Sequence, residues 1–264
     1  LEVALIVVAL DDMSEVALLY PYLKRLRFEG VEVLMPLDQA EIYNGRTPLD
    51  LINEEEMMHA SLECRMPMYR QLKRFVDVAI SLVAGVVLAP VGALVAAVIK
   101  LAEPGSPVLY HQERVGLFGK PFTIMKFRTM RAGAETESGA VWAMEGDPRI
   151  TPVGRFLRIS RLDEIPQIIN VLRGEMSIVG PRPERPEFVT QLAAAIPWYE
   201  ERENILPGIT GWAQIRYPYG SSVDDARRKL EYDLFYMKHM SMSLDIQIIL
   251  RTLRIVLLGK ERSL

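Results

Sequence analysis

The chain has 264 residues, half of them hydrophobic, and a formal net charge of −3. This is enough chain for a full hydrophobic core and favours two structural units. A single cysteine, Cys64, excludes an internal disulfide and a cysteine-based zinc site, and three scattered histidines argue against a histidine-rich metal site.

The charge is unevenly distributed along the chain. Residues 1–64 carry 4 Lys and Arg against 13 Asp and Glu, a net of −9, whereas the remainder has a net of +6. Opposite charges on two stretches indicate two modules. A basic main module suits phosphate-rich partners or an anionic membrane surface, although basic side chains are as often only a solvated face.

The first residues predict half of a doubly wound unit. Residues 1–10 are short, continuous and apolar, as in a buried strand, and begin without a basic segment or cleavage site. We therefore expect a fragment of a longer protein and no signal peptide. Ser14 could cap a helix closed by Gly30, and Val31–Met35 is a second strand candidate. No glycine-rich loop follows the first strand, so nucleotide binding there is not supported, and residues 36–68 read as a connection with a short helix.

A long apolar stretch follows a basic pair at Lys73 and Arg74. Val78–Ile99 contains 22 residues without a charge, and as a helix it would reach roughly 33 Å, enough to cross a hydrocarbon core. Pro90 lies near its middle and favours a kink. Lys73 and Arg74 flank one end and Lys100 the other, so the positive-inside rule gives no orientation. A kinked span, a re-entrant hairpin and a buried core helix all fit this pattern.

The C-terminal segment Leu244–Lys260 gives a weaker membrane signal. Leucines and isoleucines alternate there with Arg251, Arg254 and Lys260, a basic amphipathic pattern. An ordinary core helix with a solvated edge fits equally well.

A run of distinctive local sequences lies between the apolar stretch and residue 217. In chain order these are Gln112–Gly116, Lys126–Met130, Asp147–Thr151, Leu162–Gln167, Asn170–Leu172, Met176–Ser177, Val179–Pro183 and Pro207–Gln214. Each alone has an ordinary structural explanation.

The adjacent acids Asp163 and Glu164 are candidates for holding a metal ion and phosphates together. Four arginines precede them without an intervening acid, and carboxylates beside guanidiniums suit this role. Pro166 is tolerated only in a first helical turn, so we expect the next helix to start near Asp163. Both acids would then lie at a helix N-terminus, whose dipole and neighbouring arginines should keep Asp163 ionised. The alternative is that Asp163 only caps the helix.

A second candidate is the string Pro181-Arg182-Pro183. Two prolines restrict the backbone around one arginine, which suits two-point contact with a phosphate or a base edge. A structural turn with an exposed arginine is the alternative. Lys126 lies in a predicted strand, where a charged solvent-facing side chain is also common.

Taken together and in this order, the strings from about Lys73 to Gln214 resemble the bacterial sugar transferases, the monotopic phosphoglycosyl transferases. The resemblance implies an α/β fold, a small membrane-associated α/β catalytic module with a re-entrant membrane helix, preceded by part of a Rossmann-like domain. The expected division is residues 1–64, a partial Rossmann-like (CoA-binding-like) domain with a linker, and residues 65–264, the catalytic domain, with its membrane helix at residues 75–101.

The resemblance also assigns site residues. Asp163 becomes the nucleophile and Glu164 its partner in metal binding or proton transfer, with both as ligands of Mg²⁺. Substrate or nucleotide contacts fall on positions that match the family's basic and proline-braced residues: Lys126, Arg158, Pro181, Arg182 and Pro183. Pro90 matches the break of the re-entrant helix, although the family often has serine where this chain has Ala89, which leaves the break angle open.

The implied reaction transfers a sugar 1-phosphate from a UDP-sugar to polyprenyl (undecaprenyl) phosphate and releases UMP. The expected place is the cytoplasmic face of the bacterial inner membrane, as the first membrane step of exopolysaccharide, capsule or O-antigen assembly. Inner-membrane lipids are expected partners, nucleic acid is not, and a homodimer through the N-terminal domain is one option. The sugar and the pathway stay open. A nucleotide-sensing regulatory module and a non-catalytic membrane scaffold are the alternatives from other classes.

Overall fold

The computed structural model describes residues 4–9, 13–54, 57, 67–134, 147–218, 220 and 222–258. The chain divides into two compact units, Leu1–His59 and Ala60–Leu264. The boundary expected between residues 64 and 65, like Cys64, lies outside the described residues.

Unit 1 contains the predicted strand, helix and strand. β1 (Leu5–Val7) pairs in parallel with β2 (Glu32–Leu34), and α1 (Met13–Phe28) connects them. Gly30 has a φ of +92° directly after α1, as expected for a glycine that ends a helix. α1 begins one residue before Ser14, which therefore lies inside the helix and does not precede it.

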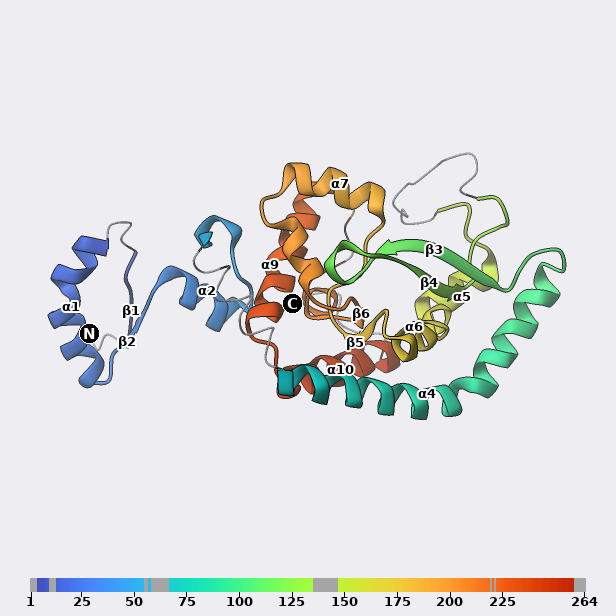
Figure 1. The fold of residues 1–264 in the computed structure, drawn as a ribbon, viewed down its shortest axis with the longest axis horizontal. Coiled ribbons are helices and arrows are strands. Elements are labelled where there is room, and N and C mark those ends of the chain that lie inside the picture. The colour runs from blue at the N-terminus through green and yellow to red at the C-terminus, as the bar shows by residue number, and fades with distance from the viewer. Residues whose placement is uncertain are drawn as a thin grey trace. The chain divides into compact units, whose positions relative to one another are not determined.

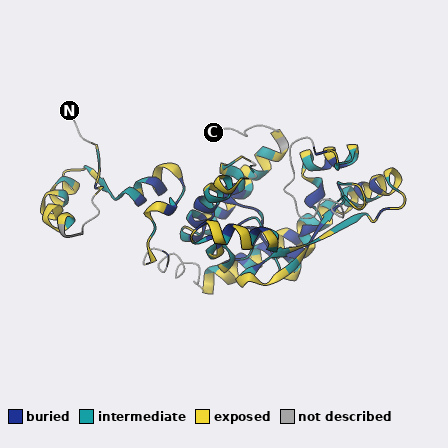
Figure 2. Ribbon diagram, turned by 90° about the horizontal axis from the view of Figure 1, so that it is seen from above, coloured by how far each residue is buried: buried dark blue, intermediate teal, exposed yellow. Residues whose placement is uncertain are grey.

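Unit 1 ends in short helical segments. α2 (Pro36–Asn44) and a 3-10 turn at Leu49–Leu51 follow β2. Most of α1 is exposed (Figure 2). Two paired strands and one flanking helix are consistent with the predicted half of a doubly wound unit, and the Rossmann-like assignment stays a prediction.

Unit 2 is built around a β-hairpin and a set of helices. The antiparallel strands β3 (Leu109–Val115) and β4 (Pro121–Phe127) pair from Leu109 with Phe127 to Val115 with Pro121. The helices are α4 (Pro67–Ala102), α5 (Pro152–Ser160), α6 (Gln167–Arg173), α7 (Pro186–Ala195), α8 (Trp212–Arg216), α9 (Val223–Lys238) and α10 (Met242–Leu258). A second small sheet pairs β5 (Ser177–Val179) in parallel with β6 (Gly208–Thr210).

α6 lies between the hairpin on one side and α4 on the other (Figure 1). The fully buried Asn170 ties α6 to β4, since its Oδ1 accepts from the Met125 amide at 3.1 Å and its Nδ2 donates to the Thr123 carbonyl at 2.7 Å. Ile124, Val171 and Met176 form an apolar cluster beside this contact. This packing holds the turn before α6 next to the end of β4.

The predicted apolar helix is present and longer than expected. α4 spans 36 residues with Pro90 inside it, and it changes direction part-way along (Figure 1). Among the described helices it alone is long and apolar enough to cross a membrane. Its second half packs into the core through Val95 and Ile99, which contact Phe127. The extra first turns are polar and contact the rest of unit 2, which is why an apolar pattern did not include them.

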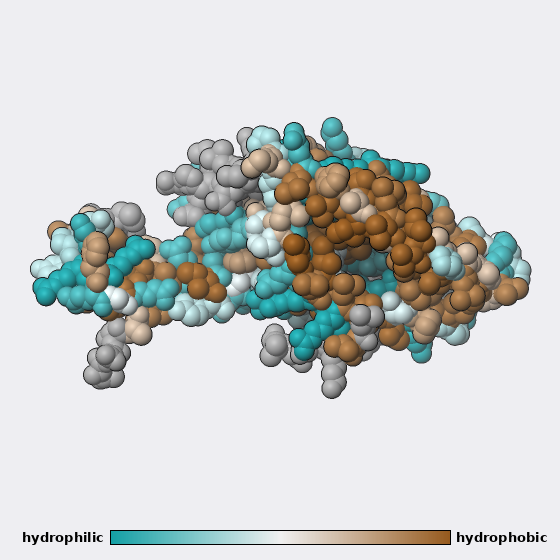
Figure 3. Space-filling model, turned by 90° about the horizontal axis from the view of Figure 1, so that it is seen from below, coloured by the Kyte–Doolittle hydropathy of each residue, from teal (hydrophilic) through white to brown (hydrophobic). Residues whose placement is uncertain are grey.

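An exposed apolar surface covers one face of unit 2. Much of the face seen from below, where α4 and α10 run, is hydrophobic (Figure 3). The exposed apolar side chains of these helices include Phe75, Leu82, Val83, Val86, Val87, Leu94, Ile246, Leu250 and Leu253. α10 confirms the predicted C-terminal helix, and its exposed apolar residues favour the amphipathic interpretation over an ordinary core helix.

Candidate active site

The two acids lie in a 3-10 turn between two helices. α5 is capped by Thr151 and ends at Arg161, whose φ of +59° turns the chain into Leu162–Glu164. α6 then begins at Gln167, so the expected helix start near Asp163 is wrong by four residues. The physical reason is Pro166, which has no N–H to continue the helical hydrogen bonds back into the turn. Asp163 and Glu164 are 7% and 9% exposed, respectively.

Glu164 is held by two cations from different elements. Its Oε1 accepts from Lys126 Nζ of β4 at 3.2 Å and from an Arg182 guanidinium nitrogen at 2.9 Å. Arg182, Lys126 and Arg161 together outweigh the effect of burial and hold the pKa of Glu164 well below its ordinary value. Burial lowers the pKa of Lys126 to about 8, although the Glu164 charge opposes that shift. The pair is therefore a charge contact with little exposure to water.

Asp163 differs from its neighbour because one of its oxygens is free. Oδ1 of Asp163 is buried and has no hydrogen-bond partner among the described residues. Burial, and then the Glu164 charge, raise the pKa of Asp163, while Lys126, Arg158 and Arg182 oppose that rise. The basic neighbours thus do not decide the direction of this pKa shift, because desolvation of a buried carboxyl is the larger effect, and the expectation that Asp163 is ionised stays a prediction. A carboxyl with a raised pKa is a more basic group once ionised.

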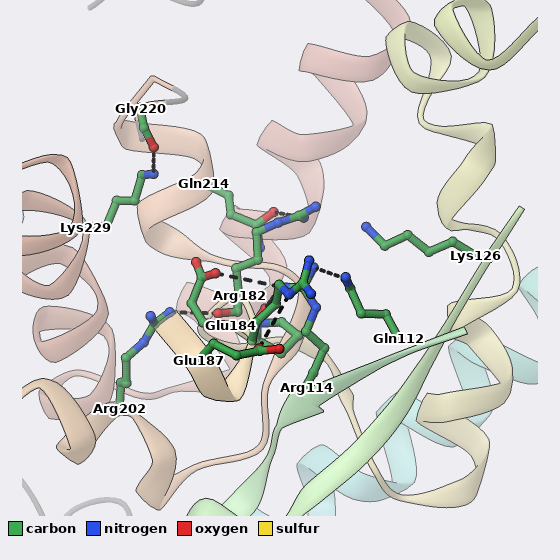
Figure 4. Close-up of polar contacts among 12 residues, drawn as sticks. Gln112, Arg114, Lys126, Arg182, Glu184, Glu187, Arg202, Gln214, Gly220 and Lys229 are labelled. Carbon is green, nitrogen blue, oxygen red and sulfur yellow. Dashed lines mark hydrogen bonds and ion pairs between the residues drawn. The ribbon is translucent and has the colours of Figure 1, made fainter. Parts of the chain in front are cut away.

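The proline-braced arginine reaches the acids across the site. One guanidinium nitrogen of Arg182 donates to Glu164 at 2.9 Å. The other donates to Gln214 Oε1 at 3.2 Å (Figure 4). Both contacts are with protein groups, and the expected two-point contact with a phosphate or a base edge stays a prediction. The backbone around Arg182 is tightly packed: a Cβ built on Gly180 would lie 2.3 Å from the Leu206 carbonyl oxygen.

The two flanking prolines contribute through their carbonyls. The Pro181 carbonyl accepts from the Gly208 amide at 2.8 Å, and the Pro183 carbonyl accepts from Arg114 at 3.1 Å. Arg158 stands further back, since its Nε donates to Thr129 Oγ1 at 2.9 Å and it affects Asp163 through charge. The structure thus brings together Asp163, Glu164, Lys126 and Arg182, with Arg158 beside them.

Sequence reasoning missed a buried support behind Arg182. Arg202 donates to the Arg182 carbonyl at 2.8 Å and to Tyr199 Oη at 2.8 Å, and pairs with Asp233 at 2.9 Å. Burial raises the pKa of Asp233 to about 6 against the opposing charge of Arg202. Arg202 and Asp233 lie in unremarkable charged stretches of the sequence, so no local signal could have found them. Gln214, by contrast, lies in the distinctive string Pro207–Gln214, which is a local signal.

The fit to a metal ion can be judged from the donors. No group of three or more His, Cys, Asp or Glu converges within the described ranges. Mg²⁺, however, is usually held by one or two carboxylates together with substrate phosphates. Asp163 offers the free buried Oδ1, whereas Glu164 Oε1 is committed to Lys126 and Arg182. The donor set therefore fits Mg²⁺ only with the phosphates present.

The site combines paired acids and clustered cations with an exposed apolar helix in the same unit. Acids beside clustered cations suit phosphate binding, and an exposed apolar helix suits membrane association. The family model that describes bacterial sugar transferases matches residues 68–259. The chain belongs to the bacterial sugar transferase family.

Three relatives illustrate the similarity. A UDP-N-acetylgalactosamine-undecaprenyl-phosphate N-acetylgalactosaminephosphotransferase of Aeromonas hydrophila is 39% identical over 90% of this chain and 55% of its own length. UDP-glucose:undecaprenyl-phosphate glucose-1-phosphate transferases of Escherichia coli and Caulobacter vibrioides are 41% and 42% identical, over 69% and 68% of this chain. The matched segments are 39% and 67% of those two proteins, so the chain spans only part of such relatives.

Proposed function

We propose that this protein transfers a sugar 1-phosphate from a UDP-sugar to polyprenyl (undecaprenyl) phosphate and releases UMP. The observation that carries the proposal is the buried, unpartnered Oδ1 of Asp163 beside the cluster of Glu164, Lys126 and Arg182. The similarity to relatives named for this reaction supports it. A free carboxylate oxygen among phosphate-binding cations is the arrangement that attack on phosphorus requires.

In the proposed mechanism, an Asp163 oxygen attacks the sugar-bearing phosphorus of the donor. The bond from that phosphorus to the bridging oxygen breaks, and UMP leaves with the bond electrons. The sugar phosphate stays on Asp163 as an acyl phosphate, and an oxygen of the lipid phosphate then attacks the same phosphorus and frees the carboxylate. Lys126 and Arg182 position the diphosphate and stabilise its charge, and Glu164 holds these two cations in place.

Mg²⁺ is the metal that we propose for this site. Asp163 and Glu164 would hold it together with the donor phosphates, and when bound it neutralises the charge of the diphosphate.

The test of the function is a screen for UMP release. Purified protein in detergent or nanodiscs is incubated with Mg²⁺, polyprenyl phosphate and one UDP-sugar at a time, and UMP is measured. We expect UMP release with at least one donor, such as UDP-glucose or a UDP-N-acetyl sugar. The accepted donor identifies the sugar. No release from any donor, with the protein folded and the lipid present, would reject the proposal.

Arg182→Lys is expected to impair turnover although it keeps the charge. One ammonium nitrogen cannot reach both Glu164 and Gln214 as the guanidinium does. We expect kcat/KM to fall on the order of tenfold or more, since small displacements at a reacting centre are costly. Arg173→Lys, an exposed arginine at the end of α6, is the control that should stay at the wild-type rate. Wild-type kinetics for Arg182→Lys would make this arginine a turn residue only.

We also propose that α4 enters and leaves the membrane on the cytoplasmic side of the inner membrane, with its break at Pro90. The mid-helix proline, the change of direction of α4 and the exposed apolar face support this topology. In a Cys64→Ser background, cysteines introduced at the exposed positions Arg70 and Lys100 should both be labelled from the cytoplasm. Pro90→Leu should shift part of the population to opposite sides. If the two introduced cysteines were labelled from opposite sides of the membrane in the protein that retains Pro90, the hairpin would be ruled out.

A further inference from the structure

We propose that the first half of α4 is a positioning element of the active site as well as part of a membrane anchor. Arg74 holds α6, the helix that follows the two acids, and Asp77 holds β5, the strand that leads to Arg182. The inference rests on the proposed function, because its main measurement is the rate of that reaction.

Asp77 holds the strand that leads to Arg182. Its Oδ2 accepts from Ser177 Oγ at 2.7 Å and its Oδ1 from the Ile178 amide at 3.1 Å. Asp77 is 4% exposed and Ser177 fully buried. Both donors are in β5, and two residues separate the end of this strand from Arg182. A shift of Asp77 would therefore be passed to the arginine through a very short, tightly packed segment.

Arg74 holds the helix that follows the acids. Its two terminal guanidinium nitrogens donate to the Val171 carbonyl at 2.5 Å and the Leu172 carbonyl at 2.9 Å. These carbonyls are in the last turn of α6, beyond the reach of the regular helical hydrogen bonds, and the Val171 carbonyl also accepts from the Gly174 amide at 3.0 Å. α6 begins three residues after Glu164, so Arg74 and Asp77 act on the two sides of the Glu164–Arg182 contact.

The polar contacts form a stripe along one side of α4. Lys73, Asp77 and Ser81 are buried at helical spacing, while Val83 and Val86 are exposed on the apolar remainder. A helix needed only as an anchor could bury apolar side chains at these positions at lower cost, because buried charged groups lose their hydration. Hydrogen bonds between these side chains and backbone or hydroxyl groups instead fix the position of α4 relative to the segments that it contacts.

The contacts of Lys73 provide a comparison within the same stripe. Lys73 Nζ pairs with Asp245 of α10 at 2.8 Å, and Tyr69 Oη donates to the same carboxylate at 3.0 Å. This tie joins α4 to α10, whereas Arg74 and Asp77 reach α6 and β5. Lys73 thus connects the two helices that bear the apolar face. Arg74 and Asp77 connect α4 to segments next to the active site.

The experiment compares Asp77→Ala and Asp77→Asn with Val86→Ala in the full chain, in nanodiscs. Val86 lies on the opposite side of α4 and is 77% exposed. UMP release is measured against donor concentration, which separates kcat from KM, and hydrogen exchange is followed over residues 163–182. We expect kcat/KM to fall between about tenfold and about 100-fold for Asp77→Ala, with less loss for Asp77→Asn, which keeps an acceptor oxygen. Exchange in β5 should increase, while Val86→Ala matches the wild type.

Ser177→Ala covers the case in which Asp77→Ala does not fold. It removes one donor and leaves the Ile178 contact, and it should give a smaller loss of kcat/KM with a smaller increase of exchange in β5. Wild-type UMP release with unchanged exchange in these variants would overturn the positioning role. Absence of UMP release in the wild type would instead count against the proposed function, and exchange would still test the contact.

Discussion

Asp163→Asn is expected to abolish both turnover and covalent capture of the sugar phosphate. The amide differs little in shape from the carboxyl but cannot form the acyl phosphate, because its oxygen carries no charge to attack phosphorus. We expect a loss of at least about 10⁴-fold in kcat, as for removal of other catalytic nucleophiles. Incubation of the wild type with Mg²⁺ and labelled UDP-sugar, without acceptor, should give up to one label per site, mapped to Asp163. With donor and lipid acceptor both varied, the steady-state kinetics should be ping-pong.

The control for this prediction is an acid outside the site. Asp224 is exposed in the first turn of α9, and Asp224→Asn should retain labelling and turnover. If the kinetics are strictly sequential and no adduct is trapped, the lipid phosphate is the nucleophile and Asp163 is reassigned to metal binding. Labelling that persists in Asp163→Asn would place the adduct on another residue.

Glu164→Gln is expected to lower activity and stability together. The amide oxygen would leave Lys126 and Arg182 without their shared counter-charge, and breaking a buried pair from one side costs on the order of 3 kcal/mol. In the wild type, burial lowers the pKa of Lys126 to about 8, and the Glu164 charge opposes that fall. Without that charge the pKa falls further, and Lys126 loses its proton at lower pH. The basic limb of kcat/KM should therefore move to lower pH, and both half-reactions should slow.

A double variant separates the two effects. Glu164→Gln combined with Lys126→Met removes one of the stranded cations, so its thermal midpoint should lie above that of Glu164→Gln alone. Activity should stay low, because the phosphate contact of Lys126 is also lost. A double variant no more stable than Glu164→Gln would mean that the buried charge is not the cause of the destabilisation.

Local sequence predicted the elements better than the connections between them. The β4 strand that carries Lys126 and the stiff loop around Arg182 follow from alternation and from two prolines. The partner of Asp77 could not be predicted, because Ser177 lies 100 positions away and neither residue stands in a distinctive charge pattern. Pairing at such separation depends on how helices pack, which one-dimensional patterns do not encode.

The environment of the acids shows the same limit. The sequence places arginines near Asp163, and cations do oppose the rise in its pKa, but burial decides the direction and the pKa is raised. Burial depends on the packing of the turn under β4 and is absent from any local count of charges. α4 likewise extends beyond the expected residues 75–101, because its first turns contact protein and were not apolar enough to be included.

The backbone crossing under Arg182 limits which substitutions this fold accepts. A Cβ at Gly208 would lie 2.2 Å from the Gly180 nitrogen, and one at Gly211 would lie 2.2 Å from the Gly180 oxygen. Two segments of main chain thus meet with no room for a methyl group, and each of the three glycines is required by the backbone that faces it. Substitutions that alter donor preference in this protein are therefore expected among the side chains around the crossing, because a change within the crossing would displace Arg182, which we propose positions the donor.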